Sequence, residues 1–142
     1  ELSSDCAVLT PLIETLRDLP GIKALRDATR GGVNAVVHEF AAACGYGIEL
    51  QESKLPINPA VRGVCELLGL DALNFANEGK LVIAVARDSA ELALSRLRAH
   101  PLGKDAAMIG EVVEQQGVRL AGLYGVKRLL DLPHAEPLPR IC

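Results

Sequence analysis

The strongest constraint on the fold is a run of six apolar residues, LVIAVA, at positions 81–86. An unbroken apolar run of this length is typical of a strand that is covered on both faces, since a half-exposed strand alternates with polar residues. The run therefore predicts a central strand with helices packed against it. Aromatic residues make up only 3% of the chain, so the core has to be built from aliphatic side chains.

Helical and strand patterns alternate on both sides of this run. The predicted helices cover about 5–18, 33–44, 59–68 and 88–100. The predicted strands cover 22–26, 47–51, 81–86, 107–113, 118–123 and 126–130. Asp88 and Glu91 resemble a capping box, and Val61, Val64, Cys65 and Leu68 are expected to face inward. This order indicates an α/β (α+β) fold in which helices pack against a mixed β-sheet.

Length and charge limit the classes of protein to consider. A chain of 142 residues with 49% hydrophobic content is the size of one domain with a proper core. The net charge of −3 makes a nucleic-acid binder unexpected, because phosphate backbones favour clustered Lys and Arg. No leader-like segment or membrane-length apolar run is present, so a cytoplasmic protein is expected. The start at Glu1, close to a helix signal, suggests a piece of a longer protein.

The four cysteines are widely scattered, at Cys6, Cys44, Cys65 and Cys142. Without a CxxC pair or a nearby His cluster, they indicate neither a zinc site nor a disulfide framework. The first three lie in apolar segments predicted to be helical, where a buried Cys acts as a small hydrophobic residue. Cys142 instead ends a segment with three prolines, which could extend roughly 30 Å in a polyproline conformation. The alternative is a frayed chain end.

The sequence DATRGG, at 27–32, directly precedes a predicted helix. Paired glycines allow close backbone approach to a ligand, and the first amides of a helix favour an anion such as phosphate. Asp27 could hold a magnesium ion, and Thr29 or Arg30 could reach a phosphate oxygen. The alternative is a structural helix start at which Gly32 only relieves crowding.

The sequence NEGKL, at 77–81, places Glu78 in a turn just before the apolar strand. A carboxylate at the end of a strand can act as a general base if a substrate proton comes within hydrogen-bonding distance. The alternative is a solvated glutamate before Gly79, which is common in turns. The histidines His38 and His100 are interpreted as structural or surface residues.

Together, DATRGG, NEGKL and the terminal PRIC resemble the C-terminal domain of the HypE family of nickel–iron hydrogenase maturation proteins, in the aminoimidazole ribonucleotide synthetase and selenophosphate synthetase superfamily. The resemblance covers essentially the whole chain, and PRIC is its most specific part. It implies that residues 1–132 are the C-terminal α/β domain of a larger ATP-dependent enzyme. Residues 133–142 would then be a flexible tail that carries the terminal cysteine.

The resemblance implies an ATP-dependent carbamoyl dehydratase. Such an enzyme would convert an S-carbamoyl group on Cys142 to a thiocyanate, the cyanide donor for the hydrogenase iron, and by the resemblance Glu78 would be the base. Asp27, Thr29, Gly31 and Gly32 correspond to phosphate-side contacts, while most contacts to ATP and Mg²⁺ are expected from an N-terminal domain outside these residues. The implied partners are the carbamoyltransferase HypF, the iron-carrying HypC–HypD complex and a second copy in a homodimer, without nucleic acid or membrane.

Two other function classes remain open at this stage. One is a sibling ATP-dependent synthetase or kinase of the same superfamily, which acts on a diffusible small molecule. The other is a non-catalytic module for protein interaction or metal delivery, in which Cys142 is a soft ligand or tether. For the HypE-like enzyme, we expect these residues alone to fold but neither to bind ATP well nor to turn over, because most ATP contacts are expected from the N-terminal domain and no Walker-type loop replaces it here.

Overall fold

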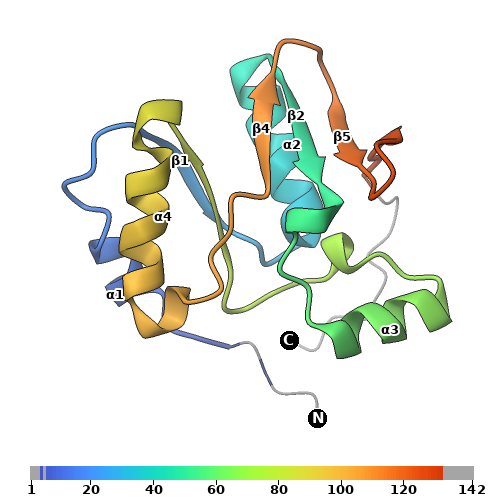
Figure 1. The fold of residues 1–142 in the computed structure, drawn as a ribbon, viewed down its shortest axis with the longest axis horizontal. Helices are drawn as coiled ribbons and strands as arrows, with labels where there is room; N and C mark the ends of the chain where they lie inside the picture. The colour runs from blue at the N-terminus through green and yellow to red at the C-terminus, as the bar shows by residue number, and fades with distance from the viewer. Residues whose placement is uncertain (1–3, 5, 133–142) are drawn as a thin grey trace.

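A computed structural model describes residue 4 and residues 6–132 of the chain. Its elements form two groups that lie side by side (Figure 1). In the first group, strands β1 (Ile22–Asp27) and β3 (Leu81–Val85) form an antiparallel pair beside helices α1 (Thr10–Glu14) and α4 (Ala90–Ala99). The second group holds a larger sheet with helix α2 (Gly32–Cys44). The chain therefore passes from one group to the other directly after β1.

The larger sheet has four strands in the order β4-β2-β5-β6. They are β2 (Gly47–Gln51), β4 (Gly110–Val113), β5 (Val118–Ala121) and β6 (Lys127–Leu129). Strands β2 and β5 are parallel, and the other neighbours are antiparallel. The mixed sheet and the α/β fold class expected from the sequence are confirmed. The last three strands are shorter than predicted, with turns at Gly117 and Gly125 that both have positive φ.

Two apolar clusters form the core. The larger one packs Val37 of α2 against Ile48 and Leu50 of β2 and Val118 of β5. The smaller one includes Leu16, Leu19 and Ala93. Strand β3 contributes to both, because Val82 packs against the larger cluster while Ile83 and Val85 pack against the smaller one. Neighbouring side chains of β3 therefore pack into two different apolar clusters.

The prediction of a central strand at 81–86 was wrong in one respect. A strand does form at Leu81–Val85, but within the described residues it pairs only with β1, in a two-stranded sheet. All five of its residues are partly exposed. An apolar run indicates that both faces have neighbours, but it does not reveal how many strands lie beside it.

Helix α1 is much shorter than the predicted helix at 5–18, and residues 6–9 are not helical. Pro11 lies in its first turn, where the missing N–H of proline is tolerated, so the helix begins only just before this residue. At its other end, the Thr15 hydroxyl donates to the carbonyl of Leu12 at 2.7 Å. The chain then continues in turns to Asp18 rather than as a helix.

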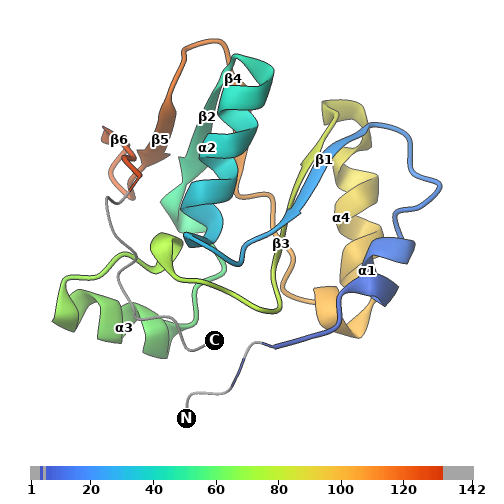
Figure 2. The same cartoon turned by 180° about the vertical axis from the view of Figure 1, so that it is seen from behind.

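The inward face predicted for helix α3 (Pro59–Leu68) was largely wrong. Only Cys65 is buried, whereas Val64 is 43% exposed and Leu68 is 62% exposed. Helix α3 lies away from the larger sheet and packs on the 3₁₀ turn η2 (Ala72–Asn74) (Figure 2). The amphipathic spacing is therefore real, but little of its apolar face is covered within the described residues.

The capping box predicted at Asp88 and Glu91 does not form. The residue preceding α4 is Ser89, which makes no side-chain capping hydrogen bond. A 3₁₀ turn, η3 (Arg87–Ser89), leads directly into the helix, so the chain is already helical before the expected start. The helix itself ends at Ala99, as predicted, before Pro101.

The cysteines differ from expectation in their exposure. Cys65 is buried, but Cys6 and Cys44 are both exposed, so the prediction that all three are core residues was wrong for two of them. Cys142 and the predicted tail at 133–142 lie outside the described residues. Among the residues that are described, no helix has the length and apolar character needed to cross a membrane.

Candidate functional site

The fold brings the two candidate motifs together. Strand β1 ends at Asp27, which lies opposite Leu81 in the antiparallel register. Beyond this pair, the N–H of Ala28 donates to the carbonyl of Lys80 at 3.0 Å, and the N–H of Asn77 donates to the carbonyl of Ala28 at 3.0 Å. Ala28 is fully buried, at 0% exposure. The NEGKL turn is therefore fixed directly against DATRGG by backbone hydrogen bonds.

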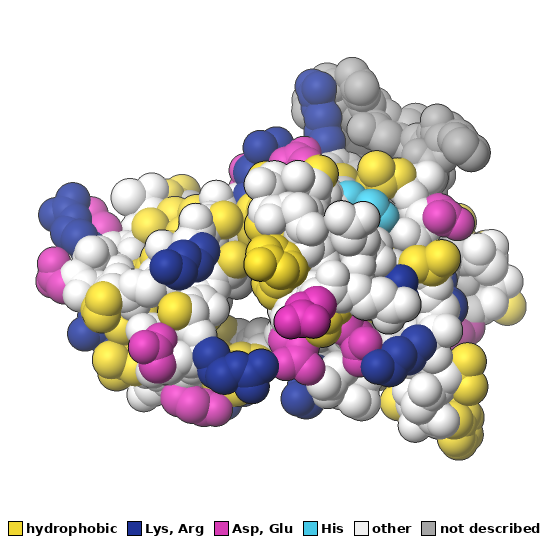
Figure 3. Space-filling view, turned by 90° about the horizontal axis from the view of Figure 1, so that it is seen from above, with side chains coloured by type: hydrophobic (Ala, Val, Ile, Leu, Met, Phe, Trp, Pro, Cys, Tyr) yellow, Lys and Arg dark blue, Asp and Glu magenta, His cyan; other side chains and the backbone are white. Residues whose placement is uncertain are grey.

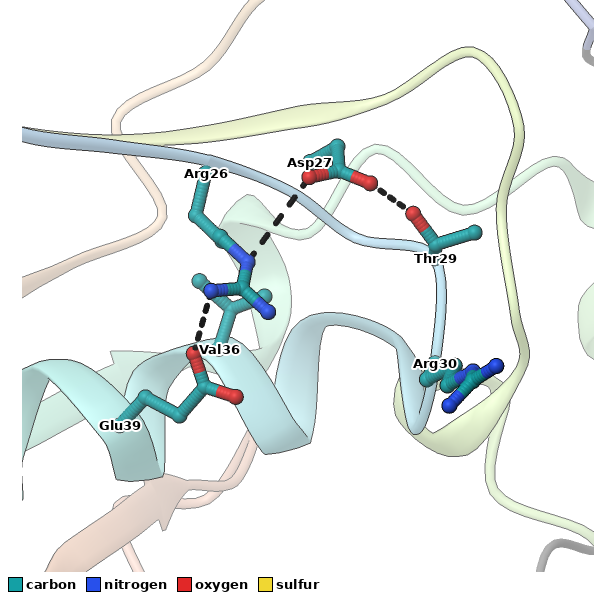
Figure 4. A pocket seen from close by; sticks show the side chains of 6 residues that line it. All are labelled: Arg26, Asp27, Thr29, Arg30, Val36 and Glu39. Carbon is teal, nitrogen blue, oxygen red and sulfur yellow. Dashed lines mark hydrogen bonds and ion pairs between the residues drawn. The ribbon is translucent and has the colours of Figure 1, made fainter.

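A shallow pocket of about 360 Å³ lies beside DATRGG (Figure 4). The residues that line it are Arg26, Asp27, Thr29, Arg30, Val36 and Glu39. The hydroxyl of Thr29 donates to Asp27, and the guanidinium of Arg26 lies 3.8 Å from Asp27 and 3.3 Å from Glu39. The carboxylates of Asp27 and Glu39 thus share one cationic neighbour, Arg26. Arg30 adds a second guanidinium to the lining of the pocket. Guanidinium groups are suited to a phosphate oxygen.

The paired glycines at the start of α2 have a packing role. Both have positive φ, 68° at Gly31 and 62° at Gly32, a conformation that side-chain-bearing residues rarely adopt. A Cβ atom on Gly32 would lie 2.4 Å from the carbonyl oxygens of Leu73 and Phe75. Gly32 therefore permits the close approach of η2, as the structural alternative supposed. Contact of these residues with phosphate stays a prediction.

The described residues do not form a ready-made magnesium site by themselves. Asp27 is the one carboxylate of the DATRGG sequence, and its oxygens already face Thr29 and Arg26. Nowhere in the described part of the chain do three or more His, Cys, Asp or Glu side chains gather closely enough to hold a metal. Asp27 as a magnesium ligand stays a prediction, because Mg²⁺ bound together with ATP takes only one or two carboxylates besides phosphate and water oxygens.

Glu78 lies in the turn that the backbone holds against DATRGG. The turn is braced by the amide of Asn77, which donates to the carbonyl of Phe75 at 2.6 Å. The side chain of Glu78 is exposed and is not one of the six residues that line the pocket. The structure thus places the backbone of the two motifs together without closing a site around the carboxylate.

Sequence reasoning missed Asn34, a buried polar residue on the inward side of α2. Asn34 is 2% exposed, and its amide nitrogen donates to the side-chain oxygen of Asn74 at 2.8 Å and to the carbonyl of Asp131 at 3.0 Å. Its position beside Val33, Val36 and Val37 was the available signal, because a single Asn on a buried apolar face requires partners.

The structural interpretation of the two histidines is confirmed. The Nε2 atom of His38 lies 2.9 Å from the carbonyl oxygen of Leu130, and its Nδ1 atom lies 2.9 Å from the carbonyl oxygen of Asn34. His100 accepts a hydrogen bond from the N–H of Leu102 at 3.2 Å and begins the 3₁₀ turn η4 (Pro101–Gly103). Both imidazole rings therefore contact backbone groups, which is a structural role.

The surface seen from above mixes charges of both signs (Figure 3). In the view from above, acidic and basic side chains are interspersed, and the surface is hollowed between the two groups of elements (Figure 3). On the molecular surface, Arg87 pairs with Glu111 at 3.0 Å, and both side chains are more than half exposed. Exposed pairs of this kind contribute little to stability.

Comparison with known proteins gives a consistent result. The family model of the AIR synthase related protein C-terminal domain matches residues 2–122. Over all 142 residues the chain is 84% identical to carbamoyl dehydratase HypE of Escherichia coli K12, and it covers 42% of that protein. A crystal structure of E. coli HypE, described as a hydrogenase maturation protein, matches with a TM-score of 0.96, and the chain covers 44% of it.

Two further solved structures carry ligands or partners in their descriptions. A HypE–HypF complex is 47% identical with a TM-score of 0.90, and the match covers 93% of this chain and 44% of that one. A hydrogenase maturation protein HypE in complex with ATP is 35% identical with a TM-score of 0.88, over 96% of this chain and 44% of the other. The chain thus spans less than half the length of the proteins that it matches.

Proposed function

The chain belongs to the family of AIR synthase related protein C-terminal domains, and from this and its likeness to HypE we propose that it is a domain of an ATP-dependent carbamoyl dehydratase for nickel–iron hydrogenase maturation. The observation that carries the proposal is the joining of DATRGG and NEGKL through both backbone groups of Ala28. This arrangement supports the proposal because the backbone of the sequence suggested for phosphate binding is joined to the turn that carries the residue suggested as the base.

The proposed reaction dehydrates an S-carbamoyl group carried on Cys142. The carbamoyl oxygen attacks the γ-phosphorus of ATP, ADP leaves, and one N–H proton is released to solvent. Glu78 then accepts the remaining N–H proton as the C–O bond breaks, so that phosphate departs with the oxygen and a carbon–nitrogen triple bond forms. The product is a thiocyanate on Cys142, with no net oxidation or reduction. Phosphorylation is needed because a carboxamide oxygen is a poor leaving group.

The remaining roles follow from the same proposal. Asp27, Thr29, Gly31 and Gly32 lie on the phosphate side, and the exposed Glu78 needs a further surface to close over it, which the rest of the longer relatives could supply. The complex of a similar HypE with HypF supports the carbamoyltransferase as the partner that loads Cys142. The HypC–HypD complex as cyanide acceptor, a homodimer of the full-length protein, Mg²⁺ as the companion of ATP and a cytoplasmic location complete the proposal.

The competing enzyme class, a sibling synthetase or kinase for a diffusible substrate, differs in its need for the terminal thiol. We therefore compare Cys142→Ala with Cys44→Ala in the full-length protein, measuring ADP formation that depends on carbamoyl phosphate and the carbamoyltransferase. Cys44 is a matched control because it is exposed at the end of α2. The proposal predicts that Cys142→Ala abolishes this activity and Cys44→Ala keeps it. Full activity of Cys142→Ala would contradict a role for the thiol, and a wild-type protein that forms no ADP under these conditions would favour the sibling enzyme.

A further inference from the structure

Helix α3 carries an apolar stripe that the described part of the chain leaves open. Val64, Leu67 and Leu68 are three and four residues apart, so they share one face of the helix. Their exposed fractions are 43%, 85% and 62%. Cys65, which lies beside Leu68 on the helix surface, is only 6% exposed. One edge of the apolar surface therefore faces the protein, and the rest faces outward. We call Val64, Leu67 and Leu68 the α3 stripe.

The charged side chains of α3 lie on the other side of the helix. The guanidinium of Arg62 is 4.0 Å from the carboxylate of Glu52, in the 3₁₀ turn η1 (Glu52–Lys54). Glu66 follows Arg62 by four residues and so shares its side. A surface helix normally turns its polar face to water, whereas α3 exposes two leucines as well. An uncharged, contiguous apolar surface of this kind suits contact with another apolar protein surface.

The α3 stripe is connected to the candidate site through η2. Helix α3 packs on η2, and η2 leads into the NEGKL turn. Glu78 follows Asn74 by only four residues, which span at most about 14 Å. The side chain of Glu78 is exposed as well. An apolar face and a candidate catalytic carboxylate that both adjoin η2 are thus open in the described residues.

The lengths of the relatives indicate what covers the stripe. The chain matches a family of C-terminal domains and covers 42% of E. coli HypE, so more than half of such a protein lies outside the match. In a protein of that organisation, the additional residues enter this domain from its N-terminal side. Residues 6–9, which lead into α1, lie at the same end of the molecule as α3, the lower end in Figures 1 and 2.

We propose that the α3 stripe is the surface on which the preceding part of the full-length polypeptide docks. The proposal goes beyond the proposed function, because it depends on the family and on the length of the relatives and not on the dehydration chemistry. The docking surface has to be apolar and without charges opposite the stripe, as at the centre of protein interfaces. Through η2, this contact adjoins the turn of Glu78, whose side chain needs a further surface to close over it.

The test measures how fast single thiols on α3 react with a maleimide in the folded full-length protein, without ATP or a partner protein. Leu67→Cys places a thiol in the stripe. Glu66→Cys is the matched control, because it places a thiol at the adjacent exposed position on the charged side. Native Cys44 is an exposed reference, and native Cys65 is a buried one on the same helix. Tandem mass spectrometry assigns the label to each cysteine, and slow labelling of Cys65 shows that a variant is folded.

Leu67→Cys is expected to react at least about tenfold more slowly than Glu66→Cys, because a covered thiol reacts only while the contact is open. Glu66→Cys is expected to react within about threefold of Cys44, as an exposed thiol does. Adding Val64→Glu to Leu67→Cys places a charge in the stripe. This double variant is expected to react about as fast as Glu66→Cys, since the charge would lose water on docking.

Equal rates for Leu67→Cys and Glu66→Cys, with Cys65 unreactive, would overturn the proposal. Protection of Leu67→Cys that disappears on dilution would assign the stripe to a second copy. Protection that disappears on removal of residues 133–142 would assign it to the end of this chain. Either result would also overturn the proposal, and protection that survives both changes supports it. No substrate is present, so a failure of the dehydratase assay leaves the labelling result unaffected.

Discussion

Replacing Gly32 by alanine tests whether the DATRGG glycines shape the site through packing. The methyl group of Gly32→Ala would lie 2.4 Å from two backbone carbonyl oxygens, of Leu73 and Phe75, and 3.0 Å from the carbonyl carbon of Asn74. Backbone atoms cannot rotate away as a flexible side chain can. The 3₁₀ turn η2 therefore has to move, and with it the NEGKL turn that follows.

The expected cost has two parts. An alanine at φ 62° costs roughly 1–2 kcal/mol for the left-handed conformation, and crowding in a packed site adds roughly 1–3 kcal/mol. Gly45→Ala is a matched control, because Gly45 has φ 73° at the other end of α2 but nothing within 4 Å of its Cβ position. The stiffer unfolded chain affects both variants equally and cancels in the comparison.

The free energy of unfolding is measured by urea titration followed by far-ultraviolet circular dichroism, since the chain contains no Trp for fluorescence. Gly32→Ala is expected to lose about 2 kcal/mol more than Gly45→Ala, which corresponds to a melting temperature lower by about 6 °C. Equal losses in the two variants would refute the packing explanation and would leave ligand approach as the reason for Gly32.

Three further predictions concern the base, the nucleotide and a helix. Glu78→Gln in the full-length protein should retain the carbamoyl group on Cys142, free or phosphorylated on its oxygen, without water loss, as seen by mass spectrometry of the C-terminal peptide, whereas Glu66→Gln on exposed α3 should lose water as the wild type does. Calorimetric titration of the 142 residues alone with ATP should show no tight binding, and tight binding would contradict the need for further residues. Gly63→Ala, inside α3 with open space at its Cβ position, should raise the free energy of unfolding by about 1 kcal/mol, and a decrease would contradict this.

Local patterns predicted the elements well where the determining interactions are short-range. The helix at 33–44 and its end at Gly45 depend on apolar spacing and on one residue that accepts positive φ, and the structure has α2 at Gly32–Cys44 with Gly45 in the left-handed conformation. Local patterns failed where a distant partner decides. The spacing of Val64 and Leu68 indicates an apolar face, but it does not reveal that so little packs against α3.

The candidate site likewise has features that the local sequence reveals and features that depend on residues far away in the sequence. DATRGG and NEGKL are visible as motifs, but their contact depends on the hydrogen bonds of Ala28, a residue whose sequence context signals nothing. The buried hydrogen bonds of Asn34 were missed because its partners lie 40 and 97 residues away along the chain. The exposure of Cys6 and Cys44 means that presentation of a thiol is not by itself distinctive, so the case for Cys142 depends on PRIC and on the relatives.

The central claim is that Cys142 carries the group that is dehydrated. Mass spectrometry of the C-terminal peptide tests it, after the full-length protein is incubated with the carbamoyltransferase, carbamoyl phosphate and ATP. The account predicts a carbamoyl adduct on Cys142. This adduct loses one water only if ATP is still present after the adduct has formed. The absence of any adduct on the C-terminal peptide would contradict the claim, and so would an adduct on Cys142 that never loses water.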